Sequence, residues 1–483
     1  MRVNMQVQTS LGLNILSQDQ CETIHFTTLE VLDRTGVNVF DQEALELLKQ
    51  GGAKVDGYRV RIPSWMVQRA LATAPCRVPM GNRDGSRAML LEKGRSYYGT
   101  GSDTPYTIDP FSGKRRLATK QDVVNFSRVC DCLENIDFVM SMALASDVSR
   151  LNSYVHQFEA MLLNTSKPIV YTAEGYRDTV DIVKMAEIVA GSPEDLVANP
   201  FMALYNEPSS PLQYSTEAVQ KLLYLAEKRL PIINVPAVML GATGPVTPAG
   251  AIVVANSELL AGLVMHQLKG EGAPYIYGGG IPPMDMITQV CSYGGPEEHQ
   301  NCAALVTMAA QFYHLPVFTT GGCTDAVEFD QQAGMEAGFN ILSTSLAGGN
   351  LIHDLGYIEA GMTSSLEMLA LCNEAVGMAK YFVKGIEITP ETLALDVIEK
   401  VQPGGNFFAE EHTFNNFKKH MYFPELLNRY AYDKWKETGA TTFKERANRK
   451  IRDILKNHCP AQLPADVIDR VKEITSKRVN DSY

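Results

Sequence analysis

The sequence has no excess of positive charge. Its 43 Lys and Arg side chains are outnumbered by 55 Asp and Glu side chains, and the formal net charge at pH 7 is −12. Nucleic acids and anionic membranes attract basic surfaces, so neither is an expected partner. A membrane-spanning run is also missing, because the longest uncharged stretch, residues 231–257, contains four prolines and three glycines and would span a membrane poorly.

Cysteine is present, but not in a pattern that indicates disulfides. The nine cysteines include no CxxC pair, and most of them fall inside apolar segments. The opening residues, MRVNMQVQTSLG, contain no apolar core of signal-peptide length. We therefore expect reduced thiols and a cytoplasmic location.

Motifs for nucleotides and metals are missing as well. The three glycines at 278–280 are followed neither by the Lys-Ser/Thr of a phosphate loop nor by the spaced glycines of a dinucleotide-binding turn. Zinc could be bound by Cys130, Cys132 and Cys323, but buried free thiols are the simpler interpretation of these residues. We expect neither a bound metal nor a bound nucleotide.

What the chain does contain is a repeating unit of strand and helix. Apolar strand candidates begin near residues 137, 168, 200, 231, 274, 316 and 350, at spacings of roughly 30 to 43 residues. Segments of helical periodicity lie between them, and an eighth strand would come from residues 97–101 or from beyond Thr363. The pattern predicts an α/β fold, a (β/α)8 TIM-type barrel, with an open doubly wound sheet as the alternative.

Additions are expected at both ends of this barrel. Residues 1–95 read as an N-terminal appendage of helices and a hairpin, and residues 96–395 as the catalytic barrel. Residues 396–483 are charged and amphipathic, and they read as a helical C-terminal cap.

Polar side chains follow the predicted strands where those strands end, which is where a barrel enzyme builds its site. The strand at 316–320 leads into a Gly-Gly turn that carries Asp325, the strand near 350 ends on His353, and the strand near 200 ends on Glu207. These three are the candidate catalytic residues. Structural roles also fit, because Asp325 is placed to cap the following helix and Glu207 precedes a proline in a turn.

Three stretches resemble a known family. GGCTD (residues 321–325), DQQAG (330–334) and GTGSD (99–103) are similar to segments of the trimethylamine:corrinoid methyltransferases, and the resemblance runs over nearly the whole chain. Founding members of that family carry pyrrolysine at the carboxyl end of a barrel strand. Here every position holds an ordinary residue, including Val327 near the place where pyrrolysine would align. The chain therefore most resembles the non-pyrrolysine branch, and within it the glycine betaine:corrinoid methyltransferases.

The resemblance implies methyl transfer from a quaternary amine, with glycine betaine giving dimethylglycine, to a Co(I) corrinoid. This sequence has no DxHxxG cobalamin loop, so the corrinoid is expected on a separate protein that docks over the barrel mouth. A quaternary ammonium departs as a neutral amine and needs no general acid, so the protein must chiefly bind and align it.

Aromatic faces and nearby carboxylates suit such a cation. The candidate substrate-binding residues are Tyr97, Tyr98, Tyr205, Asn206, Tyr277, Phe329, Tyr357 and Phe408. Asp354 and Glu207 would balance the positive charge, and His353 or the amides near Gly348 would receive a substrate carboxylate. The candidate glycines for close approach of the corrinoid are Gly279, Gly280, Gly322 and Gly349. A tyrosine at a strand end also serves ordinary packing.

Two other function classes remain open. A barrel lyase or aldolase would need a lysine at a strand end for a Schiff base, or a His-rich metal site, and no predicted strand end carries such a lysine. A noncatalytic betaine-binding protein is usually exported, and no export signal is seen. A homo-oligomer is expected, as for many soluble enzymes.

Overall fold

The computed structural model describes residues 12–86 and 88–480. At its centre is a curled parallel sheet of seven strands in the order β6-β15-β14-β13-β12-β10-β9. Its strands are β6 (Tyr97–Thr100), β9 (Ile169–Tyr171), β10 (Met202–Asn206), β12 (Ile232–Asn234), β13 (Tyr275–Gly278), β14 (Val317–Thr320) and β15 (Leu351–Leu355). These apolar runs are buried on both faces, as strands of a parallel sheet are. The predicted parallel α/β fold is confirmed, and β6 supplies the strand expected at 97–101.

The strand predicted near residue 137 is irregular. Its Phe138 and Val139 form isolated parallel bridges, to Gly99 of β6 and to Ile169 of β9. The Val139 N–H donates to the Pro168 carbonyl over 2.9 Å. The Thr100 hydroxyl bonds both the N–H (2.8 Å) and the carbonyl (3.0 Å) of Met140. The Thr100 side chain thus takes the place of the next backbone–backbone hydrogen bonds of a regular strand pair. The segment therefore contacts both edges of the sheet without forming a regular strand.

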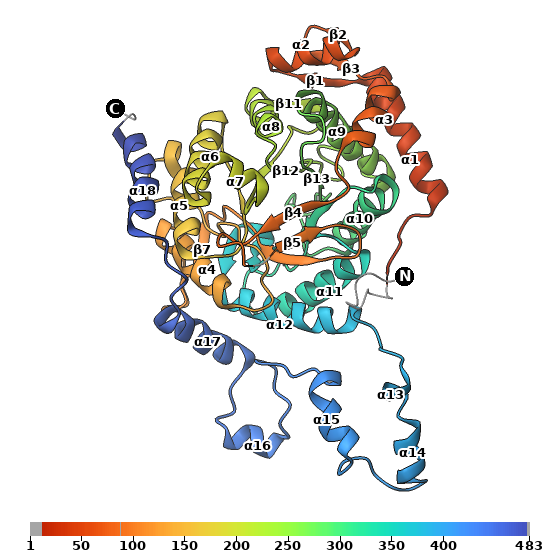
Figure 1. Ribbon diagram of the computed structural model, residues 1–483, viewed down its shortest axis with the longest axis vertical. Helices are drawn as coiled ribbons and strands as arrows, with labels where there is room; N and C mark the ends of the chain where they lie inside the picture. Colours follow the sequence, from red (N-terminus) through yellow and green to blue (C-terminus); the bar gives the residue numbers. More distant parts are fainter. Residues whose placement is uncertain (1–11, 87, 481–483) are drawn as a thin grey trace.

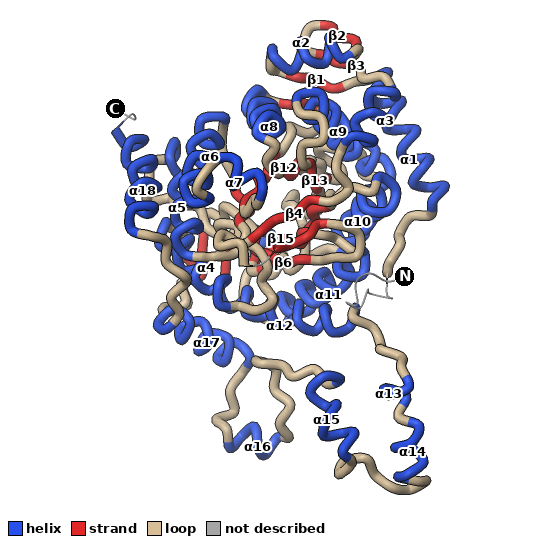
Figure 2. Tube along the Cα trace, viewed as in Figure 1, coloured by secondary structure: helices blue, strands red, loops and turns tan. Residues whose placement is uncertain are grey.

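Eight long helices surround the sheet (Figure 2). They are α4 (Lys120–Cys132), α5 (Ser153–Asn164), α6 (Tyr176–Ala190), α8 (Thr216–Lys228), α9 (Pro248–Lys269), α10 (Pro296–Val306), α11 (Gln331–Ala347) and α12 (Leu366–Val383). By length and composition α9 could cross a membrane, but 78% of its most apolar window is buried inside the molecule. It packs against α8 and against the N-terminal helices α1 (Gln18–Glu30) and α3 (Ser64–Thr73), which accounts for its apolar surface.

Residues before β6 contribute two further pieces of structure. The first is a small sheet of β1 (Val37–Val39), β2 (Lys54–Asp56) and β3 (Arg59–Arg61), which lies with α2 (Gln42–Gly51) at the top of Figure 1 and pairs with β11 (Gln213–Tyr214). The second is the hairpin of β4 (Val78–Gly81) and β5 (Ala88–Leu91), whose Val78, Met80 and Met89 join an apolar cluster with the inward side chains of the sheet strands. Because the Gly81 N–H donates to the carbonyl of Pro200, which precedes β10, the hairpin covers the amino ends of the strands.

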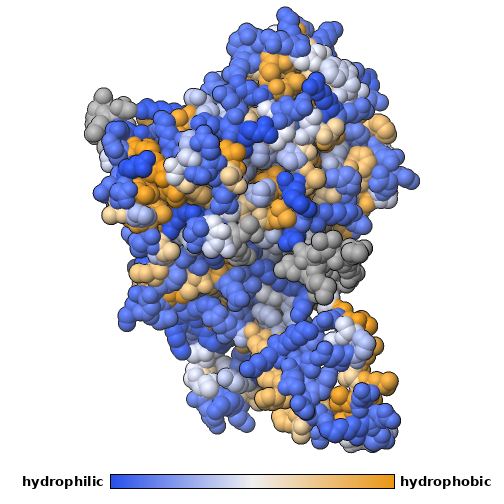
Figure 3. Space-filling view, viewed as in Figure 1, coloured by the Kyte–Doolittle hydropathy of each residue, from blue (hydrophilic) through white to orange (hydrophobic). Residues whose placement is uncertain are grey.

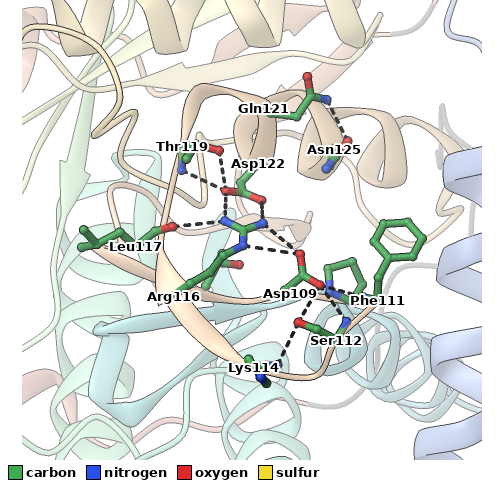
Figure 4. Close-up of polar contacts among 12 residues, drawn as sticks. Asp109, Phe111, Ser112, Lys114, Arg116, Leu117, Thr119, Gln121, Asp122 and Asn125 are labelled. Atoms are coloured by element: carbon green, nitrogen blue, oxygen red, sulfur yellow. Dashed lines mark hydrogen bonds and ion pairs between the residues drawn. The ribbon is translucent and has the colours of Figure 1, made fainter.

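A second hairpin, β7 (Tyr106–Ile108) with β8 (Arg115–Leu117), follows β6 and is joined to α4 by a charged cluster (Figure 4). The Arg116 guanidinium donates to both carboxylate oxygens of Asp122 (2.7 and 2.8 Å) and to Asp109 (3.1 Å). Asp122 also accepts the Thr119 N–H and hydroxyl at the start of α4. This bidentate contact raises the pKa of Arg116, and it fixes the hairpin to the helix.

An arm formed by α13 (Pro390–Leu393), α14 (Leu395–Val401), α15 (Glu411–His420) and α16 (Tyr432–Glu437) projects from the body (Figure 1). The predicted boundary at residue 395/396 falls at the beginning of α14. The chain then returns through α17 (Phe443–Asn457), which packs on α12 and α4, and α18 (Ala465–Asn480), which packs on α5 and α6. Apolar patches are visible on the lower end of the molecule (Figure 3), and exposed residues of the arm include Ile386, Leu395, Phe408, Phe414 and Tyr432.

Candidate functional site

A cavity of about 700 Å³ lies at the carboxyl ends of the parallel strands. Its lining comes from the segments that follow β6, β9, β12 and β13 and from the ends of β10, β14 and β15. The hairpin β4–β5 covers the opposite end of the sheet. The cavity therefore occupies the position at which parallel α/β folds place their ligands.

Four tyrosines line this cavity: Tyr154 of α5, Tyr205 of β10, Tyr293 of the loop before α10, and Tyr357 of β16 (Tyr357–Ile358). The Tyr205 hydroxyl donates to Glu207 Oε1 over 2.6 Å, and the Tyr357 hydroxyl donates to the Ser102 carbonyl. Burial raises the pKa of all four phenols, that of Tyr154 to about 12. The rings are neutral near pH 7, and their faces are suited to a cation.

Five carboxylates share the lining: Asp103, Glu174, Glu207, Glu217 and Asp354. The Ser141 hydroxyl donates to Asp103 Oδ1 over 3.1 Å. Burial raises the pKa of Asp103, against hydrogen bonds from Thr172, Ser141 and Ser102. Asp103 and Asp354 both have left-handed backbone conformations, with φ of 61° and 76°. Strained backbone at two acidic residues of one cavity is typical of a functional site.

His353 of β15 lies against the aromatic residues of neighbouring strands. Its ring stacks on Phe318, with centroids 4.1 Å apart, and lies 6.1 Å from the centroid of Tyr205. His353 Nδ1 is 2.7 Å from Asp354 Oδ1, but the angle is not that of a hydrogen bond. The contact is therefore an ion pair when His353 is protonated.

Lys221 reaches the cavity from α8 rather than from a strand. Only 7% of its surface is exposed, and its Nζ donates to the Ala173 carbonyl over 2.7 Å. Burial lowers the pKa of this ammonium to about 8, against the raising effect of nearby carboxylates, of which Glu207 acts most strongly.

The structure brings six of the residues predicted from the sequence to the cavity. These are Glu207, His353, Asp354, Tyr205, Tyr357 and Gly280. Two predicted aromatic residues of the strands point outward instead: the Tyr98 hydroxyl bonds Ser345 of α11 (2.7 Å), and the Tyr277 hydroxyl donates to Asn256 of α9 (3.0 Å). Asn206 donates to Asn234 of the next strand (3.1 Å).

The other predicted residues lie elsewhere. The Tyr97 hydroxyl accepts the Leu90 N–H of β5 (3.0 Å). Phe329 packs against Phe443 of α17, and Phe408 is 91% exposed on the arm. A side chain at Gly279 would meet Leu305 of α10, one at Gly322 would meet Leu355 and Cys372, and one at Gly349 would meet Thr319.

Asp325 stands just behind the cavity wall. Its carboxylate accepts the backbone N–H groups of Tyr293 (2.8 Å) and Gly294 (3.0 Å) and the Ser292 hydroxyl (2.5 Å). It does not cap the following helix, because Asp330 accepts the N–H groups of Gln332 and Ala333 at the start of α11. Asp325 therefore positions the loop that carries Tyr293 into the cavity.

Several lining residues were not singled out from the sequence. Asp103 follows the strand at 97–100 and could have been found by the strand-end rule. Lys221 interrupts the apolar stripe of residues 218, 222 and 225 on a helix, which is a detectable signal. Nothing in the local sequence marks Tyr154 or Tyr293, which come from a helix and a long loop.

In residues 12–86 and 88–480, no group of three or more His, Cys, Asp or Glu side chains is arranged to hold a metal ion. All nine cysteines are free thiols, Cys130 and Cys323 buried and Cys132 exposed.

The parallel α/β fold, with its cavity at the strand carboxyl ends, is similar to that of a solved protein structure. The crystal structure of the Methanosarcina barkeri monomethylamine methyltransferase superposes with a TM-score of 0.54 at 11% identity, covering 92% of this chain and 88% of that one. At this identity the similarity establishes the fold alone.

Sequence comparison is more specific. Residues 2–482 match the profile of the trimethylamine methyltransferase (MTTB) family. The chain is 34% identical over 474 residues to the trimethylamine methyltransferase MttB of Desulfitobacterium hafniense strain DSM 10664 / DCB-2, covering 98% of this chain and 95% of that protein. It is 30% identical over 470 residues to the glycine betaine methyltransferase of D. hafniense strain Y51, covering 96% and 97%. The chain belongs to the trimethylamine methyltransferase family.

Proposed function

We propose that the chain transfers a methyl group from a quaternary ammonium compound, glycine betaine first among them, to the Co(I) corrinoid of a partner protein. One observation carries the proposal: four tyrosines and five carboxylates line the cavity, and Lys221 is the one Lys or Arg among the described lining residues. A cation without N–H groups is held by aromatic faces, at about 0.5–2 kcal/mol per ring, and by diffuse negative charge.

The chemistry of the leaving group supports the same substrate class. When a quaternary ammonium loses a methyl group, the C–N bond breaks with its electron pair moving to nitrogen, and a neutral amine departs without a proton. The corrinoid, when docked, supplies the nucleophile for the methyl carbon. The chain's own residues bind and align the cation: the rings of Tyr205 and Tyr357 contact it, and Glu207 and Asp103 balance its charge.

Trimethylamine is the competing substrate, since the D. hafniense relative at 34% identity bears that name. A neutral tertiary amine would have to expel a poor, anionic leaving group. This sequence contains only ordinary residues and so lacks the pyrrolysine that the family resemblance associates with trimethylamine. The relative at 30% identity, a glycine betaine methyltransferase, supports the quaternary amine.

The lining also suits a large methyl acceptor carried by another protein. Gly280, Ala237, Ala360 and Gly361 contribute little side-chain bulk to it, so a flat macrocycle could approach the backbone closely. We further propose that the segment at Phe138 and Val139 closes the sheet into an eight-stranded barrel, since it bridges β6 and β9. A cytoplasmic location, where the free thiols stay reduced, and a homo-oligomer complete the proposal.

The test is to incubate the protein with a reduced corrinoid protein and each amine in turn, and to follow methyl-cobalt absorbance. Glycine betaine should give methyl-cobalt and dimethylglycine, while trimethylamine and dimethylglycine should be inert. Comparable turnover of trimethylamine would refute the proposal.

A specific observation also bears on the lyase or aldolase alternative, because Lys221 places an amine of lowered pKa, about 8, in the cavity. Borohydride reduction in the presence of small aldehydes and ketones would trap a Schiff base there. A covalent adduct on Lys221 would favour that alternative, and its absence would favour methyl transfer.

A further inference from the structure

We propose that Lys221 binds an anionic group at the far end of the substrate, so that the cavity prefers zwitterionic betaines to simple tetraalkylammonium ions. This inference rests on the proposed function, and it assigns a residue to the recognition of the substrate carboxylate.

The position of Lys221 is unusual for a lysine. It lies on the inner face of α8 beside the buried residues Ala218, Leu222 and Leu225. Burying an ammonium is costly unless it is paired or hydrogen-bonded. One of its three N–H groups is used by the Ala173 carbonyl at 2.7 Å, which leaves capacity for further acceptors.

Two of the four carboxylates that surround Lys221, those of Glu207 and Asp178, are held by other groups. Glu207 accepts the Tyr205 hydroxyl at 2.6 Å, and Asp178 pairs with Arg478 at 2.5 Å. In the described part of the chain, no carboxylate lies within the 4.0 Å of an ion pair with Lys221 Nζ. A ligand carboxylate would supply the partner that the protein itself does not.

The charged groups of the cavity lining leave few other places where an anionic group of the substrate could bind. Five carboxylates line the cavity and would repel it, and the imidazole of His353 is already 2.7 Å from Asp354. The amides near Gly348 and Gly349, considered from the sequence, precede β15 and so lie at the strand end opposite the cavity. Among the described residues of the lining, Lys221 is the remaining cationic group.

A cavity of about 700 Å³ also has room for more than one trimethylammonium group. The cationic head would lie among Tyr205, Tyr357 and His353 on β10, β16 and β15, and the tail would extend toward α8. This arrangement selects for charge at both ends of the substrate.

The experiment compares Lys221→Met with Lys221→Arg, using isothermal titration calorimetry without any corrinoid. The probes are glycine betaine and tetramethylammonium. Lys221→Met should weaken glycine betaine binding about 10-fold to 100-fold, the worth of a hydrogen bond to a charged group. The same variant should leave tetramethylammonium unchanged or bound more tightly, because a positive charge has been removed from the cavity. Lys221→Arg should restore part of the betaine affinity.

Three results would contradict the assignment of Lys221, and they can be told apart. If Lys221 only offsets the surrounding carboxylates, Lys221→Met will tighten the binding of both cations, and the assignment is overturned. Equal weakening of both, with a thermal melting point lower than that of the wild type, would also overturn it. If the wild type binds neither cation, the proposed function fails together with this inference.

Discussion

The Asp325 carboxylate accepts the backbone N–H of Tyr293 over 2.8 Å, and so fixes the orientation of a cavity tyrosine from a different strand end. The same carboxylate holds Ser292 and Gly294, and Glu336 of α11 accepts the Asp325 N–H at 2.9 Å. The loop before α10 and the GGCTD turn are thereby joined into one unit. Asp325 is a positioning residue for the aromatic wall.

Replacing Asp325 tests this role. Asp325→Ala should weaken tetramethylammonium binding several-fold and cost about 1–3 kcal/mol of unfolding free energy, because buried N–H groups lose their acceptor. The control is Asp330→Ala, which removes the cap of α11 and should cost about 1 kcal/mol without changing cation affinity. Calorimetry and urea denaturation measure the two effects. An Asp325→Ala protein that binds the cation normally would show that the loop keeps its position without Asp325.

The tyrosine rings should contribute through their faces rather than their hydroxyls. Tyr205→Leu should weaken tetramethylammonium binding about 3-fold to 30-fold, the worth of one cation–π contact. Tyr205→Phe, which loses only the bond to Glu207, should bind nearly as well as the wild type. Phe408→Leu is the matched control, since Phe408 is 91% exposed on the arm and should not affect binding. A larger loss in Tyr205→Phe than in Tyr205→Leu would assign the affinity to the hydroxyl instead.

The strand-end glycines differ in how much space an added side chain would have. Gly322 and Gly348 both have positive φ, 83° and 87°, but a side chain at Gly322 would meet Leu355 and Cys372, whereas one at Gly348 meets nothing within 4 Å. Gly348→Ala should cost about 1 kcal/mol for the backbone conformation alone. Gly322→Ala should cost clearly more and lower amine binding and methyl transfer together. Selective loss of methyl transfer in Gly322→Ala would indicate that this glycine faces the methyl acceptor.

Because of Glu159, the unfolding free energy should depend on pH in the acidic range. Burial raises its pKa, but hydrogen bonds from His156 and Lys120 outweigh burial and lower the pKa to about 2. Because the pKa of the folded state lies below that of the unfolded state, the stabilisation is complete above about pH 4.5 and is lost as the pH falls toward 2. Glu159→Gln should lower the unfolding free energy at pH 7 by about 1–3 kcal/mol, because hydrogen bonds to a charged group are lost. The difference from the wild type should shrink as urea titrations are repeated at lower pH, and a constant difference would contradict the assignment.

If Lys221 binds the substrate carboxylate, the affinity for glycine betaine should fall as the pH rises into the alkaline range. The lowered pKa of about 8 means that Lys221 loses its proton above that pH, although the nearby carboxylates of Glu207, Asp178, Glu217 and Glu174 act to raise the pKa. Glycine betaine binding should weaken between pH 7 and 9, and tetramethylammonium binding should not. The Lys221→Arg variant should remove this pH dependence, because arginine stays protonated.

Some features followed from the sequence alone. Short apolar runs at regular spacing favour parallel strands, and β9, β10 and β12–β15 lie where the pattern placed them, whereas the run near residue 137 forms only isolated bridges. Residues at the carboxyl ends of those strands, such as Glu207 and His353, reach the cavity because strand direction alone determines which end they occupy.

Tertiary structure decided the rest. Side chains alternate between the two faces of a strand, but the alternation does not say which face turns inward. Curvature of the sheet turns Tyr205 toward Phe318 and His353, and turns Tyr98 and Tyr277 out toward α11 and α9. Tyr154, Lys221 and Tyr293 come from two helices and a loop, so their place in the cavity depends on how those elements pack around the sheet. Apart from the lysine within the apolar stripe of α8, local sequence carries no record of that packing, which is why these three residues join Tyr205 and Tyr357 in one cavity only in the folded chain.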